Sequence, residues 1–312
     1  MSNGGWKHQS VLLAESIEFL NPVASGRYID ATLGAGGHSE ALLSQEGSVE
    51  ILGIDRDLEA IRLSTERLAA FGKQLHLFHG VYSEMQSYCE EIGWDCVDGI
   101  LMDLGVSSMQ LDDDIRGFSY MTDGPLDMRM NRKDRITASE LLNGYTEGEL
   151  AKIFHDYGEE PGARRLAKAI VKRREERPLE RTGEFLEIIQ STLGKPGSRS
   201  RRPEARCFQA VRIAVNEELD ILRETLESAL QLLKPGGRLV VISFHSLEDR
   251  IVKQFMRDEA SEWSGQVSNA ELRQAKDPRL KILNRKPIVA GDDEQYENSR
   301  SRSAKLRVAE KM

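Results

Sequence analysis

Residues 28–57 follow the order of a nucleotide-binding unit, and this stretch constrains the fold more than any other part of the chain. It begins with a short apolar run, turns through Gly34, Gly36 and Gly37, and continues with helical spacing. It ends with a second, β-branched run that closes at Asp55. Strand, glycine turn, helix, strand and acid, in this order, are typical of open α/β sheets that bind a nucleotide beyond their strand ends.

The residues around the glycine turn narrow the type of ligand. Asp55 lies 19 residues after Gly36, where an acid can accept hydrogen bonds from both ribose hydroxyls. Asp30 lies before the glycines, where its charge would repel a pyrophosphate but would suit an ammonium group. A dinucleotide pattern would need glycine in place of Ser39, and the chain lacks the P-loop that binds triphosphates. The pattern favours S-adenosylmethionine as the ligand; the alternative is a structural turn with capping acids.

The composition indicates a soluble protein without a metal site or a disulfide framework. At 312 residues the chain suits one or two domains, and 39% hydrophobic residues suffice for a sizeable core. The three cysteines, Cys89, Cys96 and Cys207, are too few and too scattered for a disulfide framework or a zinc site. Because we find no signal peptide and no apolar run long enough to cross a membrane, we expect a cytoplasmic location.

Positive charge is concentrated in one segment of an otherwise acidic chain. The formal net charge is −8, yet residues 162–206 hold 13 lysines and arginines against 6 acids. The segment includes a run rich in glycine, serine and arginine that contains Arg199, Arg201 and Arg202. A basic patch on an acidic protein predicts contacts with phosphates, and we expect these three arginines to bind RNA. The alternative is a solvated helix face.

Two further strands are predicted to bring more functional groups to the same edge of the sheet. The run 74–78 predicts a third strand, and Tyr82 follows in the loop where an adenine would lie. The run 97–103 predicts a fourth strand that ends at Asp103. Three strands would then end near an acid each. Because carboxylates held close together repel one another, their concentration favours a role in ligand binding.

The distance to the next strand predicts an inserted domain. The run 237–244 reads as the fifth strand, more than a hundred residues after the fourth, and a helix with apolar spacing over 208–233 precedes it. A connection of that length is far beyond the usual crossover of an α/β sheet. We therefore expect a mostly helical insert at 113–205 within a sheet domain formed by residues 1–112 and 206–312.

Several motifs of unusual composition occur between residues 7 and 307. In the sheet region they are KHQSVLL at 7–13, GAGGHS at 34–39 and DLGVSS at 103–108. Further motifs are QLD at 110–112, RGFS at 116–119, DGPLDMRM at 123–130 and FQAVR at 208–212. The last are ISFHSLEDR at 242–250 and RSAKLR at 302–307. Together these motifs resemble the MraW/RsmH family of methyltransferases.

The resemblance implies a class I (Rossmann-like) methyltransferase sheet with an inserted helical domain. It implies methyl transfer from S-adenosylmethionine to the exocyclic N4 amine of a cytidine in small-subunit ribosomal RNA. The expected partner is that RNA or the assembled small ribosomal subunit. The resemblance also implies a set of cofactor-binding residues, which are Gly36, Gly37, His38, Asp55, Tyr82, Asp103 and Gln110.

The chemistry of the reaction assigns further expected roles. A cytosine amine is a weak nucleophile, so the enzyme has to align it and hold its protons. Asp103 is the expected acceptor, with Ser243 and His245 as secondary possibilities, and His38 is expected to anchor the loop. The aromatic residue that stacks on the cytosine stays open among Phe118, Tyr120 and Phe244. A non-catalytic RNA-binding or ribosome assembly factor and a small-molecule methyltransferase are the other functions that we consider.

Overall fold

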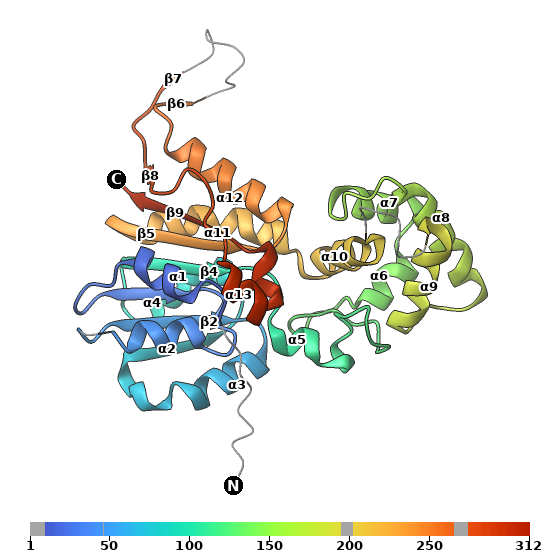
Figure 1. Ribbon diagram of the computed structural model, residues 1–312, viewed down its shortest axis with the longest axis horizontal. Coiled ribbons are helices and arrows are strands. Elements are labelled where there is room, and N and C mark those ends of the chain that lie inside the picture. Colours follow the sequence, from blue (N-terminus) through green and yellow to red (C-terminus); the bar gives the residue numbers. More distant parts are fainter. Residues whose placement is uncertain (1–9, 46, 195–201, 265–273) are drawn as a thin grey trace. The chain divides into compact units, whose positions relative to one another are not determined.

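The computed structural model describes residues 10–45, 47–194, 202–264 and 274–312. The chain divides into two compact units (Figure 1). The first comprises residues 1–105 and 220–312, and the second comprises residues 106–219. No helix among the described residues is long and apolar enough to span a membrane.

The first unit is built on a seven-stranded sheet with the order β3-β2-β1-β4-β5-β9-β8. Strands β1 to β5 run parallel, and β9 and β8 add an antiparallel edge. The strand bounds are β1 Arg27–Asp30, β2 Glu50–Asp55, β3 Leu75–His79, β4 Val97–Asp103, β5 Leu233–Ser243, β8 Leu280–Ile282 and β9 Lys305–Lys311. A separate short hairpin pairs β6 Trp263–Ser264 with β7 Gln274–Ala275.

Helices connect these strands and cover the sheet. They are α1 Leu13–Leu20, α2 Gly37–Leu43, α3 Leu58–Arg67, α4 Met85–Glu91, α11 Glu218–Leu232, α12 Ser246–Glu259 and α13 Asp292–Glu297. Short 3₁₀ segments are η1 Ala69–Gln74, η2 Tyr82–Glu84 and η5 Ser299–Ser303. The parallel strands and their crossover helices confirm the predicted α/β class.

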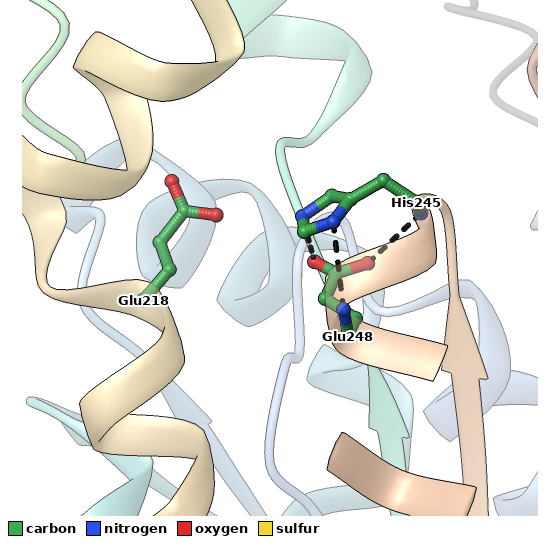
Figure 2. Close-up of side chains that lie close together, drawn as sticks. All are labelled: Glu218, His245 and Glu248. Carbon is green, nitrogen blue, oxygen red and sulfur yellow. Dashed lines mark hydrogen bonds and ion pairs between the residues drawn. The ribbon is translucent and has the colours of Figure 1, made fainter. Parts of the chain in front are cut away.

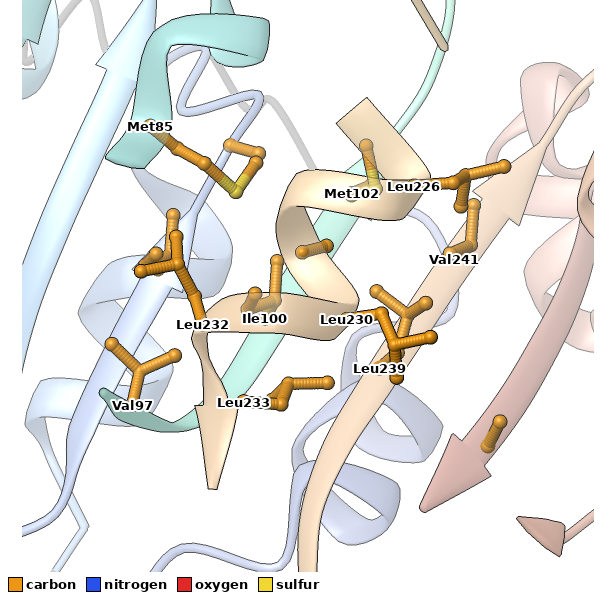
Figure 3. Close-up of a cluster of buried hydrophobic side chains, with 14 of the residues drawn as sticks. Met85, Val97, Ile100, Met102, Leu226, Leu230, Leu232, Leu233, Leu239 and Val241 are labelled. Atoms are coloured by element: carbon orange, nitrogen blue, oxygen red, sulfur yellow. The ribbon is translucent and has the colours of Figure 1, made fainter. Parts of the chain in front are cut away.

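Alternate residues of the central strand belong to two different hydrophobic cores. Along β4, Ile100 and Met102 pack into one core together with helices α4, α11 and α12. Leu101 points the other way, into a core that includes Leu12 and Leu42. Side chains alternate along a strand in this way, so a central strand is apolar throughout. Figure 3 shows the first of these cores, with Leu226 and Leu230 of α11 beside the β4 side chains.

The second unit is helical, as predicted for the insert. Its elements are α5 Ser108–Asp112, η3 Asp114–Arg116, α6 Ala138–Gly144, α7 Glu147–Asp156, α8 Ala163–Glu176, α9 Thr182–Leu193 and α10 Pro203–Asn216. Capping boxes begin α6 and α7, where Thr137 pairs with Glu140 and Thr146 pairs with Glu149. These caps satisfy the N–H groups that a helix start leaves free. One apolar core, which includes Phe154 and Phe185, fills the unit.

The continuous helix predicted over 208–233 is wrong, because the structure divides it into α10 and α11. Glu217 lies between them with a φ of 53°, a left-handed conformation that ends α10. The Asn216 side chain donates to the carbonyl of Met128 and accepts from the N–H of Met130, so it ties the end of α10 to a distant loop. Apolar spacing continues across the break, and the sequence therefore gave no sign of it.

The second unit extends beyond the predicted insert at residues 113–205 on both sides. Helix α10 packs its Cys207, Phe208 and Val211 side chains into the core of the second unit. It therefore belongs to that unit, although the sequence had assigned it to the helix that precedes β5. The recognition role predicted for the insert stays a prediction.

Candidate functional site

Three acidic residues end neighbouring strands of the first unit at the carboxyl edge of its sheet. Asp55 ends β2, Asp30 ends β1 and Asp103 ends β4, and these three strands are adjacent in the order β2-β1-β4. This is the arrangement that the sequence predicted. Ligands of open α/β sheets bind at this edge. The surroundings of the three carboxylates differ, and the differences indicate what each one can do.

Asp30 is buried and accepts two hydrogen bonds from residues close to it in the sequence. The Ser39 hydroxyl donates to Oδ2 at 2.7 Å, and the Thr32 N–H donates to Oδ1 at 3.3 Å. Burial raises the pKa of Asp30 to about 6, although both hydrogen bonds act to lower the pKa. The carboxylate is therefore costly to ionise in the folded protein, and a cation placed beside it would remove that cost.

Asp55 accepts two backbone hydrogen bonds that hold its carboxylate in place. The Gly34 N–H donates to Oδ2 and the Asp57 N–H donates to Oδ1, each at 2.8 Å. Burial raises the pKa of Asp55 to about 6 despite these two bonds. Because a carboxylate oxygen has two lone pairs, each oxygen still has room for one hydroxyl donor. A ribose with two adjacent hydroxyls fits this orientation.

Asp103 has one carboxylate oxygen that no described residue contacts with a hydrogen bond. Its Oδ1 is buried, whereas its backbone N–H donates to the Thr32 hydroxyl at 2.6 Å. Its Oδ2 lies 3.9 Å from Nδ1 of His38. Burial, together with the charges of Asp30 and Glu248, raises the pKa of Asp103 well above its ordinary value. A buried polar atom without a partner is unusual, and here it leaves an acceptor for a ligand.

The glycine turn follows directly from the first strand. Gly34 and Gly36 have φ values of +52° and +77°, which favour glycine. Gly37 is needed for a different reason, because a Cβ at that position would lie 2.1 Å from the Ser10 hydroxyl. The glycines therefore let the backbone turn sharply after β1. The N–H groups of Gly34 and Gly36 donate to the Asp55 carboxylate and to the carbonyl of Leu33.

His38 is buried at the start of α2 and lies between two fixed groups. Its Nε2 is 3.1 Å from the carbonyl of Val11, and its Nδ1 faces Asp103. The adjacent Leu12 N–H donates to the Glu294 carboxylate of α13 at 2.8 Å. These contacts fit the predicted anchoring role. Sequence reasoning missed Val11 and Glu294, because nothing in a linear pattern relates residues so far apart.

The two secondary acceptors at the end of β5 already have structural contacts. Ser243 is buried, and its hydroxyl donates to the carbonyl of Lys305. His245 precedes α12 and caps it, and its N–H donates to the Glu248 carboxylate (Figure 2). The Phe244 N–H also donates to Glu248. His245 Nε2 lies 3.1 Å from Glu248 Oε1. Ser243 is therefore less suited to accept a substrate proton than Asp103. His245 Nε2, like Oδ1 of Asp103, is buried without a hydrogen-bond partner among the described residues.

Two aromatic residues of the first unit lie in the loops after the strands. Tyr82 begins η2 and packs, half-buried, against the core that includes Met85. Its contact with an adenine stays a prediction. The Phe244 ring lies above Gly105, where a Cβ would approach it to 3.7 Å. Phe244 therefore borders the backbone that follows Asp103.

The other predicted contact residues belong to the second unit. Gln110 is buried, and it forms a capping box with Ser107 at the start of α5. Phe118 is buried beneath the Arg116 guanidinium, whose carbon lies 5.7 Å from the ring centre. Tyr120 packs edge-to-face on a ring of the insert's core. All three side chains thus already have packing or capping contacts within their own unit.

The basic segment places exposed cations on one helix of the second unit. Helix α8 buries Leu166 and Ile170, while Arg164, Arg165, Lys168 and Lys172 are exposed. Within the part of the chain that the structure describes, none of these four cations has an ion-pair partner. Arg202 directly precedes α10, whereas Arg199 and Arg201 lie outside the described residues.

Comparison with known proteins identifies the family. The model of the MraW methylase family matches residues 5–312 of this chain. A ribosomal RNA small subunit methyltransferase H of Carboxydothermus hydrogenoformans is 46% identical over 98% of both chains. The protein of the same name from Geobacter sulfurreducens is 49% identical over 98% of this chain and 99% of its own.

The match spans both units and every motif of the site. The third relative, from Citrifermentans bemidjiense, carries the same name and is 48% identical over 98% of each chain. Similarity of this degree extends over nearly the full length of the chain and therefore over both units. The chain belongs to the MraW methylase family and is an S-adenosylmethionine-dependent methyltransferase.

Proposed function

We propose that this enzyme transfers a methyl group from S-adenosylmethionine to the exocyclic N4 amine of a specific cytidine in bacterial small-subunit ribosomal RNA. The observation that carries the proposal is the buried, unpartnered Oδ1 of Asp103 at the ligand edge of a chain from this family. The substrate is the RNA itself or the assembled small subunit. We place the enzyme in the cytoplasm, where that RNA is found.

The first unit supplies the groups that would hold the cofactor. Asp55 offers two oriented oxygens to the ribose, and Gly36 and Gly37 let the backbone approach it. Asp30 would supply negative charge for the ammonium end, and Tyr82, at the start of η2, would pack on the adenine. Gln110 and His38 complete the set of cofactor residues in this proposal. The cofactor supplies a methyl carbon that is already activated by the adjacent sulfonium.

Asp103 would act on the amine of the target cytosine. When the amine attacks a methyl carbon, positive charge develops on its nitrogen, and a fixed carboxylate stabilises that charge in a site that excludes water. The Oδ1 atom is free to accept one amine N–H, which also aligns the nitrogen lone pair. Because its pKa is raised, the carboxylate is a better proton acceptor than an ordinary aspartate.

The loop after Asp103 differs from the usual base clamp of amino-group methyltransferases. Those enzymes commonly carry two prolines and an aromatic residue there, whereas this chain has Leu104, Gly105 and Val106. We propose Phe244 as the ring that stacks on the cytosine. Its ring borders Gly105, and it belongs to the same unit as Asp103.

The insert would bind the RNA around the target nucleotide. Four unpaired cations on α8 and the arginines 199, 201 and 202 suit contacts with phosphates. A base has to leave its stack to reach a buried carboxylate, so we expect the target cytidine to be unpaired or flipped. Tight binding of the flanking RNA backbone would compensate for the free energy that unstacking the base costs.

Transfer of labelled methyl groups tests this proposal. The enzyme is incubated with labelled S-adenosylmethionine and, in separate reactions, small ribosomal subunits, RNA extracted from them, and a metabolite mixture. Labelled RNA is then digested to nucleosides and separated. We expect the label in N4-methylcytidine from RNA or subunits, and none in the metabolites.

Other outcomes would identify the two alternative functions. Label in a small metabolite, with none in RNA, would indicate a small-molecule methyltransferase and would leave the basic insert without a purpose. Binding of subunits without any transfer would indicate an assembly factor. An Asp103→Ala variant serves as the matched control, since it should bind RNA as well as the wild type but transfer methyl far more slowly.

A further inference from the structure

The first unit carries a basic groove whose lining residues include none of the three acids at the carboxyl edge of the sheet. The groove has a volume of about 470 Å³ and lies between α12, β8 and β9. Four of its lining residues are cations, namely Lys253, Arg257, Arg285 and Arg307. The chain as a whole is acidic, so this concentration of positive charge needs an explanation.

Three of the four cations are available for a ligand. Lys253 is half-buried, and Arg257 and Arg285 are exposed. Among the described residues, none of the three forms an ion pair or a hydrogen bond through its side chain. Arg307 differs, because it is buried and donates to the Asp249 carboxylate at 2.6 Å. Arg307 is therefore held in place by an ion pair, whereas the other three cations have no such contact among the described residues.

The acids near the groove have partners of their own. At the end of α12, Glu259 accepts from Arg279 and lies 3.6 Å from Lys276. The Asp258 carboxylate accepts from Gln254. The Asp249 carboxylate is shared between Arg307 and a lysine of β9. Asp249 and Glu259 are thus paired with cations, and Asp249 offsets the charge of Arg307, whereas Asp258 keeps its charge. Lys253, Arg257 and Arg285 are not paired with any of these three acids.

The backbone holds these cations on rigid elements. Lys253 and Arg257 are four residues apart on α12, so their Cβ atoms lie about 5–6 Å apart on one face. Asn284 donates to the carbonyl of Leu306 and accepts from the N–H of Val308, which ties the segment before Arg285 to β9. A preorganised set of cations loses little entropy when it binds an anion.

We propose that this groove binds the phosphate backbone of the RNA substrate, as a contact of the sheet unit in addition to those of the insert. The inference rests on the proposed function. Helix α12 begins directly after the carboxyl end of β5, and Lys253 lies seven residues, or about 10 Å, along it. Phosphates a few nucleotides from a cytosine bound at Asp103 would reach the groove.

The test compares two variants that each lose three positive charges. The groove variant carries Lys253→Gln, Arg257→Gln and Arg285→Gln. The control variant carries Arg62→Gln, Lys73→Gln and Arg223→Gln, which lie on other exposed parts of the same unit. Binding of fluorescent small ribosomal subunits, and of RNA extracted from them, is measured for both variants at several salt concentrations. S-adenosylmethionine affinity and melting temperature report on the fold.

We expect only the groove variant to lose affinity, roughly tenfold or more at ~0.1 M salt, with the log–log salt slope smaller by about two to three. Its cofactor affinity should equal that of the wild type. A salt slope that matches the control variant on both probes would overturn the proposal. The same holds if phosphorus NMR shows that the groove variant has lost binding of inorganic phosphate while its RNA affinity is unchanged, since the groove would then be a small-anion site.

The experiments distinguish an error in the proposed RNA binding by the groove from an error in the proposed function. Wild-type enzyme that labels N4 of cytidine, together with a groove variant that binds RNA as well as the wild type, would refute the groove alone. Wild-type enzyme that never labels RNA would refute the proposed function, whatever the binding data.

Discussion

The carboxyl edge of the sheet has two halves, one at the ends of β1 and β2 and one at the end of β4. The carboxylates of the two halves have different surroundings. At the ends of β1 and β2, Asp30 and Asp55 accept hydrogen bonds from their own chain on both oxygens. At the end of β4, Asp103 keeps a buried oxygen without a partner among the described residues. The first half is therefore preorganised for a ligand that stays in one position. The second half retains an acceptor for a group whose charge changes during a reaction.

This difference suggests a division of labour that mutations can test. In our proposal, the β1–β2 half sets the affinity for the cofactor and the β4 half sets the rate of methyl transfer. The two halves are neighbours on one sheet, so their effects are separable only if each carboxylate contacts a different part of the reacting complex.

Asp103→Ala should slow methyl transfer by about 10²–10³-fold, because it removes the carboxylate that stabilises charge on the attacking nitrogen. Asp103→Asn keeps an oxygen acceptor without the charge, so its rate should fall between those of the wild type and the alanine variant. Single-turnover rates at saturating S-adenosylmethionine measure the effect. Full recovery of the rate at saturation would leave Asp103 as a cofactor-binding residue only.

Asp55→Ala should weaken cofactor binding by about 1.5–3 kcal/mol, since it removes charge-assisted hydrogen bonds to the ribose. It also leaves the Gly34 N–H without its acceptor, so part of the loss reflects a less ordered turn. Calorimetric titration measures the affinity, and circular dichroism checks the fold. An unchanged affinity would refute the ribose position in the β1–β2 half.

Cofactor affinity should decrease as the pH falls below about 6. The pKa values of Asp30 and Asp55 are raised to about 6 by burial, so the folded state favours their protonated forms. The stability that this protonation contributes to the free protein is present below pH ~4, and it is lost as the pH rises through about 6. A cationic cofactor prefers the ionised acids, and its affinity should change by at most roughly tenfold per pH unit and carboxylate.

Titrations between pH 5 and pH 7.5 measure this dependence, and Asp30→Asn separates the two acids. That variant cannot ionise at position 30, so its affinity should be lower at neutral pH and should vary less with pH. A wild-type affinity that is constant over this range would contradict the pKa shifts of the β1–β2 half.

Glu248→Gln should shift the pH dependence of the β4 half by a small amount. The charge of Glu248 helps to raise the pKa of Asp103, so its removal should lower that pKa. Glutamine keeps an oxygen that can accept from the Phe244 N–H, which preserves the start of α12. The acidic limb of the single-turnover rate profile should move to lower pH. A profile that does not move would show that Asp103 does not govern this limb.

The positions of the three acids could be predicted from the sequence, whereas their surroundings could not. The spacing of apolar residues and the order of the predicted elements along the chain identify which residue ends each parallel strand. All such strands end at one edge of the sheet. The contacts that distinguish the acids come from residues such as Thr32, which is 71 positions away from its partner Asp103. The unpartnered oxygen of Asp103 depends on every side chain around it, so no local pattern predicts it.

Long-range contacts also explain why a single helix was predicted across Glu217, where the structure has two. Local spacing favoured continuity from α10 to α11, but Asn216 forms its hydrogen bonds with residues 128 and 130. The glycine turn, by contrast, was predictable because Gly34 and Gly36 need their left-handed backbone whatever surrounds them.

A double-mutant cycle tests the division of labour most directly. The value of kcat/KM for methyl transfer to small ribosomal subunits is measured for the wild type, Asp55→Ala, Asp103→Ala and the double variant. If the two halves act independently, the losses of transition-state stabilisation should add to within about 0.5 kcal/mol. A double variant that is no slower than Asp103→Ala alone would show that the two carboxylates act as one unit, and it would contradict the account.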